Sequence, residues 1–375
     1  MITVDTAIIG GGPAGMACAI ALQKKGVSVL VIEKRQFPRE KTCGGYLTDK
    51  TVQQLKKLAD PALLERQYRQ VFDRVELYDR DRLLTSSPIS LPLRAIRRRD
   101  FDAFLAGLYR EAGGRLLENC VCRRVDPAEG RLELSTGEEV RFSHLVVSDG
   151  ALSPTARQLG YPARPLGFCV ETFVPKDRLP QIRTPRIVFG LVSPGYAWVF
   201  PSGEEICIGF GNRYTEKMDY TGILKDYLRQ LGADPEAAVI RGAFLPYGPV
   251  LRQKRSQSSV LLVGDAGGYL DPIYGEGLYF AVTSGMEAAE AIAGGGGECL
   301  SDYLRRMEPH RKTIRQGLRF QKLFFSGAAQ RLFVKKVAGR NRFVGFYCDR
   351  QVARYTYSYA GLRKLFSDYR RWKKG

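Results

Sequence analysis

Three glycines and one acidic residue near the start of the chain form a pattern that can hold a nucleotide. Gly10, Gly12 and Gly15 fill the glycine positions of G-x-G-x-x-G, and Glu33 follows 18 positions after Gly15. The first glycine permits a tight turn, the second lets a pyrophosphate approach the backbone, and the third lets a helix pack closely on a strand. A carboxylate at Glu33 can accept hydrogen bonds from both hydroxyls of an adenosine ribose. The pattern predicts a dinucleotide site but does not choose between FAD and NAD.

The elements around these residues are the ones that such a site needs. Residues 2–9 (ITVDTAII) predict a buried strand, residues 16–26 a helix, and residues 27–33 (VSVLVIE) a second strand that ends at Glu33. The helix begins at the glycine-rich turn, where its unpaired N–H groups can bind a phosphate. A glycine-rich turn without a nucleotide is a poor alternative in this strand–turn–helix–strand context.

Two later segments extend the pattern over most of the chain. Residues 144–157 read HLVVSDGALSPTAR, and residues 260–277 read VLLVGDAGGYLDPIYGEG. Together with the first glycine motif, they resemble the flavoprotein monooxygenase and reductase superfamily with the p-hydroxybenzoate hydroxylase fold. Its motifs are G-x-G-x-x-G, then D-G-x-x-S-x-x-R, then G-D-A…D-P…G-x-G, in the order found in this chain. The resemblance implies that the nucleotide is FAD.

The resemblance also implies roles for individual residues. Asp265 would hydrogen-bond the ribityl or pyrophosphate part of FAD. Gly275 to Gly277 would place backbone amides near the N1/O2 edge of the flavin, where negative charge develops on reduction. Asp149 would link a strand to a turn rather than act as a catalytic acid. The residues assigned to FAD are Gly10, Gly12, Pro13, Ala14, Gly15, Glu33, Lys34, Cys43, Gly44, Arg98, Asp149, Gly150, Gly264, Asp265, Pro272, Gly275, Glu276 and Gly277.

Residues 196–211, YAWVFPSGEEICIGFG, combine an aromatic run with glycines. The three aromatic residues alternate, so on a strand they share one face. The order Y-x-W-x-F-P followed by G-x-G, together with FPREKTCGGYL at 37–47 and DPIYGEG, resembles the geranylgeranyl reductase family, which saturates isolated double bonds of polyprenyl chains. In that family the aromatic strand and its G-x-G partner line the cavity for the hydrocarbon. The resemblance therefore predicts a substrate site made of Tyr196, Trp198, Phe200, Gly209 and Gly211.

The pairing of this hairpin decides whether the aromatic face is open or filled. The P-S-G-E sequence after the aromatic run predicts the turn. An even number of loop residues would put Tyr196 and Trp198 opposite Cys207, Gly209 or Gly211, which leaves a slot for an apolar ligand. An odd number would put two isoleucines and a phenylalanine beside the aromatic rings and describe a filled core. Alternating aromatic residues are also typical of an ordinary buried sheet face, but the glycines favour the slot.

Arg98 and Cys43 are assigned through the resemblance. Arg98 matches the family's R-x-x-F-D position, where the arginine contacts FAD, although Arg97 and Arg99 adjoin it. Cys43 lies in the segment that the family places near the isoalloxazine ring, and it is the matching candidate for a proton donor when hydride from reduced FAD saturates an alkene. A small buried residue is the alternative, because free cysteines are often buried. NAD(P)H or ferredoxin would supply the electrons.

Other functions stay open on the sequence alone. The same FAD could serve a monooxygenase, or a halogenase acting on a secondary metabolite or a carrier-bound substrate, or a dehydrogenase that reduces a membrane quinone. A halogenase would need a lysine near its reactive channel, which no motif locates. A non-catalytic flavin-binding module that recruits a redox partner is the alternative from another class. No metal site is expected, because His144 and His310 are far apart and the cysteines form no CxxC pair.

The order of the segments predicts two interleaved domains and a C-terminal region. The fold class is an α/β FAD-binding domain combined with an α+β substrate domain built on an antiparallel sheet. The FAD-binding domain would take residues 1–60, 95–160 and 255–300. The substrate domain would take residues 61–94 and 161–254, and residues 301–375 would form basic helices.

The positive charge of the chain is concentrated near its C-terminal end. Residues 301–375 hold 20 Lys+Arg and 4 Asp+Glu, a net charge of +16 out of a total of +19. These helices either pack on the body with solvated basic faces or contact a membrane surface or an acidic partner. Nucleic acid is not expected, because no nucleic-acid motif accompanies the charge. No apolar run approaches the roughly 20 residues of a membrane span, so we expect a cytoplasmic protein with possible peripheral membrane contact.

Overall fold

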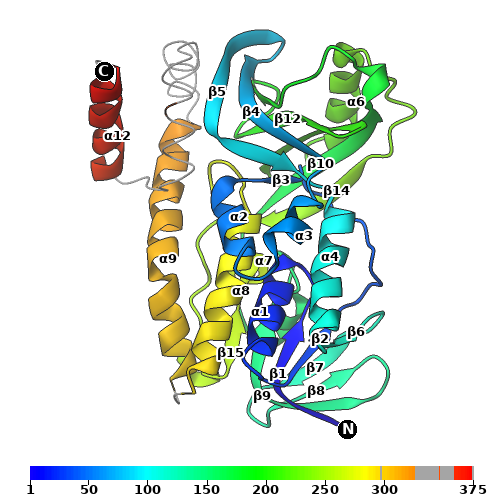
Figure 1. Ribbon diagram of the computed structural model, residues 1–375, viewed down its shortest axis with the longest axis vertical. Coiled ribbons are helices and arrows are strands. Elements are labelled where there is room, and N and C mark those ends of the chain that lie inside the picture. Colours follow the sequence, from blue (N-terminus) through cyan, green and yellow to red (C-terminus); the bar gives the residue numbers. More distant parts are fainter. Residues whose placement is uncertain (296–297, 326–345, 347–358, 374–375) are drawn as a thin grey trace.

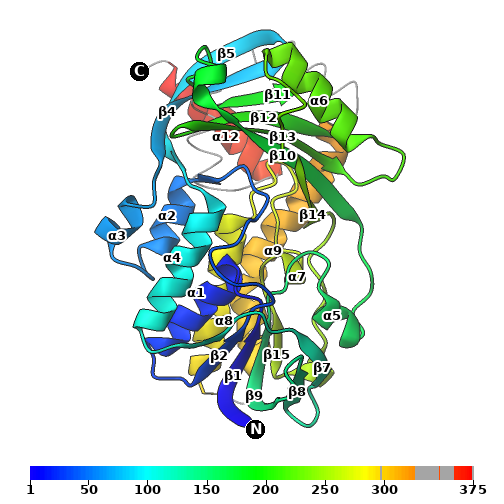
Figure 2. The same ribbon diagram turned by 90° about the vertical axis from the view of Figure 1, so that its right-hand side faces the viewer.

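The computed structural model describes residues 1–295, 298–325, 346 and 359–373. Within this part of the chain, the strands form one sheet of seven and one sheet of eight, which lie at opposite ends of the molecule (Figure 1, Figure 2). The first sheet contains the glycine-rich turn, and the second contains the aromatic hairpin. Both parts of the expected fold are therefore present: the α/β nucleotide-binding sheet and a second sheet that is antiparallel except for one parallel strand pair.

The first sheet is parallel at its centre. Its order is β6-β2-β1-β9, and the far edge of β9 pairs with β8 along its first half and with β15 along its second half. Because β1, β2, β6, β9 and β15 run parallel, the loops that follow them meet at one edge of the sheet, where α/β proteins bind ligands. The strands are β1 (Ile2–Ile9), β2 (Val29–Ile32), β6 (Arg115–Leu117), β7 (Cys122–Asp126), β8 (Arg131–Leu134), β9 (Glu139–Val147) and β15 (Val260–Leu262).

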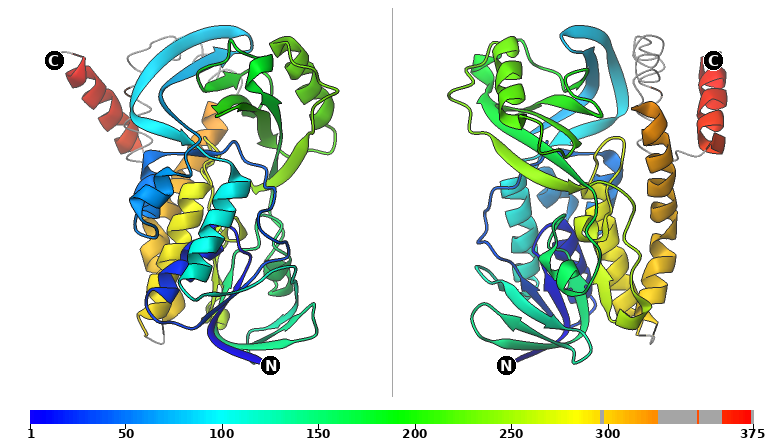
Figure 3. Two further views of the ribbon diagram at one scale, coloured as in Figure 1. Left: turned by 45° about the vertical axis from the view of Figure 1, so that its right-hand side comes forward. Right: turned by 180° about the vertical axis from the view of Figure 1, so that it is seen from behind.

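Two helices beside this sheet make very close backbone contacts, one with the glycine-rich turn and one with the other helix. A Cβ atom on Gly15 of α1 (Pro13–Gln23) would lie 2.0 Å from the Gly10 carbonyl oxygen, and one on Gly285 of α8 (Leu278–Ala293) would lie 2.1 Å from that of Ala14. Glycine is needed at both positions because any side chain would overlap backbone atoms. Helix α4 (Arg98–Glu111) packs on α1, and α9 (Cys299–Phe324) runs beside α8 (Figure 3).

The second sheet carries α6 (Tyr220–Leu231) on its outer face, and its other face is turned toward the first sheet (Figure 2). Its order is β14-β10-β13-β12-β11-β4-β5-β3. The strands are β3 (Tyr46–Leu47), β4 (Gln70–Asp79), β5 (Arg82–Ala95), β10 (Leu166–Pro175), β11 (Arg186–Phe189), β12 (Gly195–Ser202), β13 (Glu205–Arg213) and β14 (Arg241–Pro246). Strand β3 belongs to this sheet although it lies within residues 1–60, which the sequence assigned to the FAD-binding domain. The domain boundaries otherwise stay predictions.

Shorter elements complete the described structure. They are α2 (Asp49–Leu55), α3 (Pro61–Glu65), α5 (Pro154–Gln158), α7 (Gly264–Gly267), α12 (Tyr359–Trp372) and two 3-10 turns, Lys176–Arg178 and Arg255–Gln257. In the predicted C-terminal region, α9 and α12 are helical, and residues 326–345 and 347–358 lie outside the described part. None of the described helices is both long enough and apolar enough to cross a membrane.

The aromatic hairpin has a loop of two residues. Ser202 pairs with Glu205, and Gly203, with a φ of +64°, opens the turn between them. Tyr196 therefore faces Gly211, and Trp198 faces Gly209. The even-loop alternative is confirmed, and the isoleucines of β13 pack under α6 on the other face of the sheet.

The two glycines of β13 differ in the space around them, which gives a matched test. A Cβ atom on Gly209 would lie 2.5 Å from the Val170 carbonyl oxygen and 2.6 Å from the Trp198 ring, whereas the shortest contact on Gly211 would be an ordinary 3.4 Å, to Cys169. We predict that Gly209→Ala lowers the free energy of unfolding by about 1–3 kcal/mol, as overpacking does. Gly211→Ala should change it by less than about 0.5 kcal/mol.

Urea unfolding of both variants beside the wild type measures this difference. Equal stability of the two variants would show that the β12–β13 packing is looser than described.

Candidate active site

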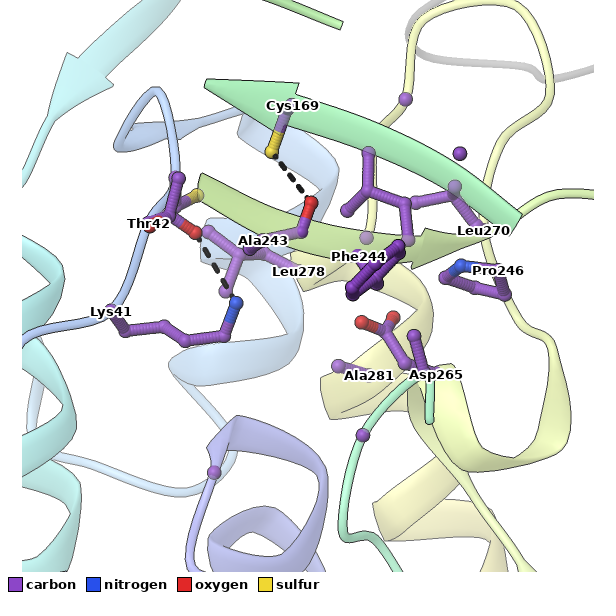
Figure 4. A pocket seen from close by; sticks show the side chains of 18 of the residues that line it. Lys41, Thr42, Cys169, Ala243, Phe244, Pro246, Asp265, Leu270, Leu278 and Ala281 are labelled. Carbon is purple, nitrogen blue, oxygen red and sulfur yellow. Dashed lines mark hydrogen bonds between the residues drawn. The ribbon is translucent and has the colours of Figure 1, made fainter. Parts of the chain in front are cut away.

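A cavity of about 830 Å³ lies between the two sheets. The loops after β1, β2, β9 and β15 line one side, and strands β10, β12 and β14 of the second sheet line the other. Figure 4 shows Cys169 of β10 and Phe244 of β14 on one side of the cavity and Asp265 on the other. This side of the first sheet is the edge where the parallel strands end. The cavity thus joins the predicted nucleotide residues to the predicted substrate residues.

The glycine-rich turn opens onto this cavity. Gly10 has a φ of +103°, and a Cβ atom there would lie 2.5 Å from the Ser148 carbonyl oxygen, so this residue must be glycine for the turn to form. At Gly12 a Cβ atom would meet only the Arg39 guanidinium, 4.0 Å away. Helix α1 begins at Pro13 without a side-chain cap. Its N-terminal amides and the open backbone at Gly12 leave room for a pyrophosphate.

Glu33 stands where β2 ends, with its side chain almost fully buried. One carboxylate oxygen accepts a hydrogen bond of 2.9 Å from the Gly11 amide. The same oxygen forms an ion pair with the Arg39 guanidinium at 3.3 Å. These contacts fix the carboxylate beside the cavity, where Lys34 also lies. Arg39 is a site residue that sequence reasoning missed, although it lies in the segment 37–47 that carried the family resemblance.

The structure separates the three consecutive arginines. Arg98 lines the cavity and holds Asp102 through two hydrogen bonds, of 2.7 and 2.9 Å. Burial by itself lowers the pKa of Arg98, but the Asp102 carboxylate more than offsets this effect and raises it overall. Arg97 instead stacks on Phe173, and Arg99 is exposed. Among the three, only Arg98 is placed to contact a ligand in the cavity.

The other FAD motifs surround the middle of the cavity. Asp149 accepts hydrogen bonds from the Ser153 hydroxyl and the Thr155 amide, so it links β9 to α5 as expected. Gly150 follows with a φ of +91° and open space around it. Asp265 of α7 points into the cavity below Phe244 (Figure 4). Burial raises the pKa of Asp265, and the positive charges of Lys41, Arg164 and Arg98 offset part of that rise.

The loop that carries Pro272, Gly275, Glu276 and Gly277 also lines the cavity. Asp271, which sequence reasoning did not assign, is buried and accepts hydrogen bonds from the Ile273 and Tyr274 amides, so it shapes this loop. Glu276 forms an ion pair with Lys50 of α2. Burial lowers the pKa of Lys50 to about 8, although the Glu276 charge acts in the opposite direction.

The predicted substrate residues form one wall of the cavity, with one exception. The rings of Tyr196, Trp198 and Phe200 follow one another at 6.3 and 6.4 Å, and Gly211 lines the cavity beside them. Gly209 does not line the cavity, because the Trp198 ring lies over it. The indole ring therefore fills the slot expected at Gly209. Gly209 makes room for the Trp198 ring and does not contact a ligand in the cavity.

Cys43 and Gly44 lie against this wall. A Cβ atom on Gly44 would come within 3.1 Å of the Phe200 ring, which explains a glycine here. Cys43 is half-buried and lines the cavity, and its amide donates a hydrogen bond of 2.8 Å to Glu171. Glu171 is a further residue that sequence reasoning missed. Its only signal was an isolated acidic residue in the apolar run CVETFVP of β10.

Neither histidine lines the cavity. Burial, together with the nearby positive charge of Lys50, lowers the pKa of His310 to about 4. Across the described residues, no group of three or more His, Cys, Asp or Glu side chains is arranged to hold a metal ion.

Comparison with known proteins bears on the cofactor. Residues 4–189 match the pyridine nucleotide-disulphide oxidoreductase family. The chain is 29% identical to a menaquinone reductase of Mycolicibacterium smegmatis, over 80% of this chain and 78% of that protein. It is 28% identical to a chloroplastic geranylgeranyl diphosphate reductase of Oryza sativa, over 94% and 80%. The chain belongs to the FAD-dependent oxidoreductases.

Solved structures agree on the fold of this FAD-dependent oxidoreductase. A geranylgeranyl bacteriochlorophyll reductase-like protein of Thermoplasma acidophilum matches with a TM-score of 0.78 and 19% identity, over 98% of this chain and 96% of that one. A flavin-dependent brominase matches with a TM-score of 0.73 and 21% identity, over 98% and 99%. The sequence relatives confirm the resemblance to the geranylgeranyl reductase family, and the solved structures confirm the p-hydroxybenzoate hydroxylase-like fold.

The cavity suits the FAD that this family implies. The turn at Gly10 and Gly12 leaves backbone exposed for a pyrophosphate, and Glu33 presents a fixed carboxylate for a ribose. At Gly275, with a φ of +65°, a Cβ atom would meet only the Tyr196 hydroxyl, 3.8 Å away, so this loop is open toward the cavity. The individual contacts of these residues with FAD stay predictions.

The neighbouring arginines offer a matched test of the FAD site. We predict that Arg98→Lys weakens FAD binding by about 10- to 100-fold, because loss of a charge-assisted hydrogen bond costs about 1.5–3 kcal/mol. Arg99→Lys should leave the affinity unchanged, because this side chain is exposed. Titration of the two apoproteins with FAD, followed by flavin fluorescence, measures both constants. If both variants are folded by circular dichroism and bind FAD with equal affinity, Arg98 does not contact FAD.

Proposed function

We propose that this FAD-dependent oxidoreductase reduces C=C bonds of a linear apolar substrate of the isoprenoid or lipid type. The observation that carries the proposal is the position of the aromatic wall. The Tyr196 hydroxyl donates a hydrogen bond to the Tyr274 carbonyl, which lies in the loop predicted to face the flavin. The substrate wall and the flavin loop therefore adjoin each other directly.

The cavity continues past the aromatic rings along apolar side chains. Val75 of β4, Ile89, Leu91 and Leu93 of β5, and Ile187 of β11 line this part. A lining of this kind suits a hydrocarbon chain, because burying apolar surface contributes about 25 cal/mol per Å². The names of the curated relatives support the same class, since two of the proteins that the chain resembles are reductases named for geranylgeranyl compounds.

The residues of this chain would support the reaction in three ways. Bound FAD, once reduced, supplies a hydride to one carbon of the double bond. An isolated alkene accepts hydride poorly, so the aromatic wall must hold it in place and exclude water. Cys43 holds a proton at its Sγ atom, on the side of the cavity where the wall and the loop meet. NAD(P)H or ferredoxin is the electron donor that we propose.

A second candidate function is supported by one side chain. Lys41 lines the cavity, and its ammonium group donates a hydrogen bond of 3.3 Å to the Thr42 carbonyl (Figure 4). A halogenase would need a lysine of this kind in its reactive channel, and no sequence motif pointed to it. An FAD-dependent halogenase or monooxygenase is therefore the alternative.

Product mass distinguishes these functions. We predict that the holoenzyme, reduced anaerobically with dithionite, is reoxidised by a polyprenyl substrate such as geranylgeranyl diphosphate, and that the product gains two hydrogens. Dithionite makes the result independent of the natural donor. If reoxidation needs oxygen and the product gains an oxygen atom, or a halogen when halide is present, the protein is a monooxygenase or a halogenase and not a reductase.

We further propose that the basic C-terminal region contacts an anionic lipid surface. Helix α12 exposes Phe366 and Trp372, about half of each side chain, together with Arg363, Arg370 and Arg371. Basic residues interleaved with exposed aromatic ones are typical of helices that lie on membrane surfaces. This contact would bring the cavity close to a membrane-bound substrate.

The tryptophan content of the chain permits a specific test. The chain has two tryptophans, so Trp198→Phe leaves Trp372 as the single reporter. Its emission should shift to shorter wavelength with phosphatidylglycerol vesicles at low ionic strength and return at about 0.5 M salt, where charge interactions are screened. Neutral vesicles are the control. An unchanged spectrum at low salt would rule out the lipid contact.

A further inference from the structure

One charged side chain lies within the otherwise apolar wall. The pairing of β10, β13 and β12 puts Glu171, Gly209 and Trp198 in one row across the sheet. The rows on either side are Cys169–Gly211–Tyr196 and Phe173–Cys207–Phe200. Glu171 thus belongs to the face that carries the aromatic rings, and its side chain is only 2% exposed.

The Glu171 carboxyl connects the Cys43 loop to the aromatic wall. One oxygen accepts the 2.8 Å hydrogen bond from the Cys43 amide. The other accepts the Cys207 thiol at 3.6 Å, and the same sulfur accepts the Trp198 indole N–H at 3.4 Å. The Cys43 thiol is three bonds from its own amide nitrogen, so it lies near the carboxyl, and its sulfur also accepts the Gly45 amide at 3.5 Å and interacts with the Arg98 guanidinium.

The surroundings of Glu171 raise the pKa of its carboxyl above the ordinary value. Burial raises the pKa of the carboxyl, and the bond from the Cys43 amide, the Cys207 thiol, and the charges of Lys41 and Arg97 offset part of that rise. A carboxyl whose pKa lies above its usual range can act as an acid at a pH where an exposed one cannot. The titratable and charged groups that face it are Lys41, Cys43, Arg97, Cys169, Cys207 and its β14 neighbour Arg241.

We propose that Glu171 is a positioning and proton-supplying residue that acts through Cys43, a role that rests on the function proposed above. As one substrate carbon receives a hydride from reduced FAD, the S–H bond of Cys43 breaks and its proton forms a C–H bond at the other carbon. Glu171 then transfers its O–H proton to the Cys43 sulfur and takes a new proton from water. The substrate would gain two hydrogens, one as the hydride with its two electrons from reduced FAD and one as the proton from Cys43.

A purely structural role makes a different prediction. Glutamine at position 171 keeps an oxygen that accepts the Cys43 amide and has nearly the same shape, but it carries no transferable proton. A structural role would therefore survive Glu171→Gln. Glu205→Gln is the matched control, because the Glu205 carboxylate pairs with Arg69 and Arg97, at 3.0 and 3.9 Å, whereas the Glu171 carboxyl accepts the Cys43 amide.

The main experiment is a single turnover of the reduced holoenzyme with geranylgeranyl diphosphate, from pH 5 to 9. Wild type should lose rate as pH rises through the titration of Glu171, because only the protonated carboxyl delivers a proton. We expect Glu171→Gln to slow flavin reoxidation by about 10²-fold or more, in the range of general acids, and to lack this pH dependence. FAD affinity and substrate affinity should stay unchanged. Glu171→Asp should recover part of the rate, and Glu205→Gln should match the wild type.

A second readout does not depend on substrate. In the holoenzyme without substrate, the rate of Cys43 alkylation by iodoacetamide is followed against pH by peptide mass spectrometry. Glu171→Gln, which replaces the neighbouring carboxyl by an amide, should change this alkylation profile, whereas Glu205→Gln should leave it as in the wild type.

The outcomes separate the two proposals. A wild-type rate and pH profile in Glu171→Gln overturn the role of Glu171. A shifted alkylation profile in an enzyme that no polyprenyl substrate reoxidises leaves the coupling to Cys43 standing and overturns the proposed function.

Discussion

The site depends on direct contact between backbone segments that no side chain separates. Helix α1 approaches the turn before it at Gly15, and α8 approaches α1 at Gly285, in each case so closely that a single methyl group would overlap a carbonyl oxygen. These two contacts hold the N-terminal end of α1 at the edge where the parallel strands end. The glycine-rich turn, the Glu33 carboxylate and the Asp265 carboxylate are all placed relative to this helix. A shift of α1 would therefore change the whole nucleotide side of the cavity.

The side of the cavity that would hold the substrate depends on the register of the β12–β13 strand pairing. Alternate residues of a strand face opposite sides of its sheet, so a slip of one residue in the β12–β13 pairing would exchange the two faces of β13. The isoleucines that now pack under α6 would enter the cavity, and Gly211 would leave it. The two-residue loop at Gly203 excludes that arrangement. The turn at the end of the β12–β13 hairpin thus determines which side chains of β13 face the cavity.

The sequence predicted the parts of the site that are local in the chain. The glycine turn, the strand that ends at Glu33, the Asp149 link and the aromatic strand each follow from residues within one segment. It could not predict contacts that arise from the meeting of distant segments. Cys43 and Glu171 are 128 positions apart, and Arg39 reaches Asp102 from another loop. Gly209 shows a further limit, since its pairing partner could be expected, but not that the Trp198 ring would lie over it.

The hydrogen bond between the Tyr196 hydroxyl and the Tyr274 carbonyl closes the cavity on one side. It ties a strand of the second sheet to the loop before α8, so the two walls cannot separate independently at this point. A movement of the loop before α8 would therefore be passed to the aromatic wall, and a movement of the wall would be passed to the loop.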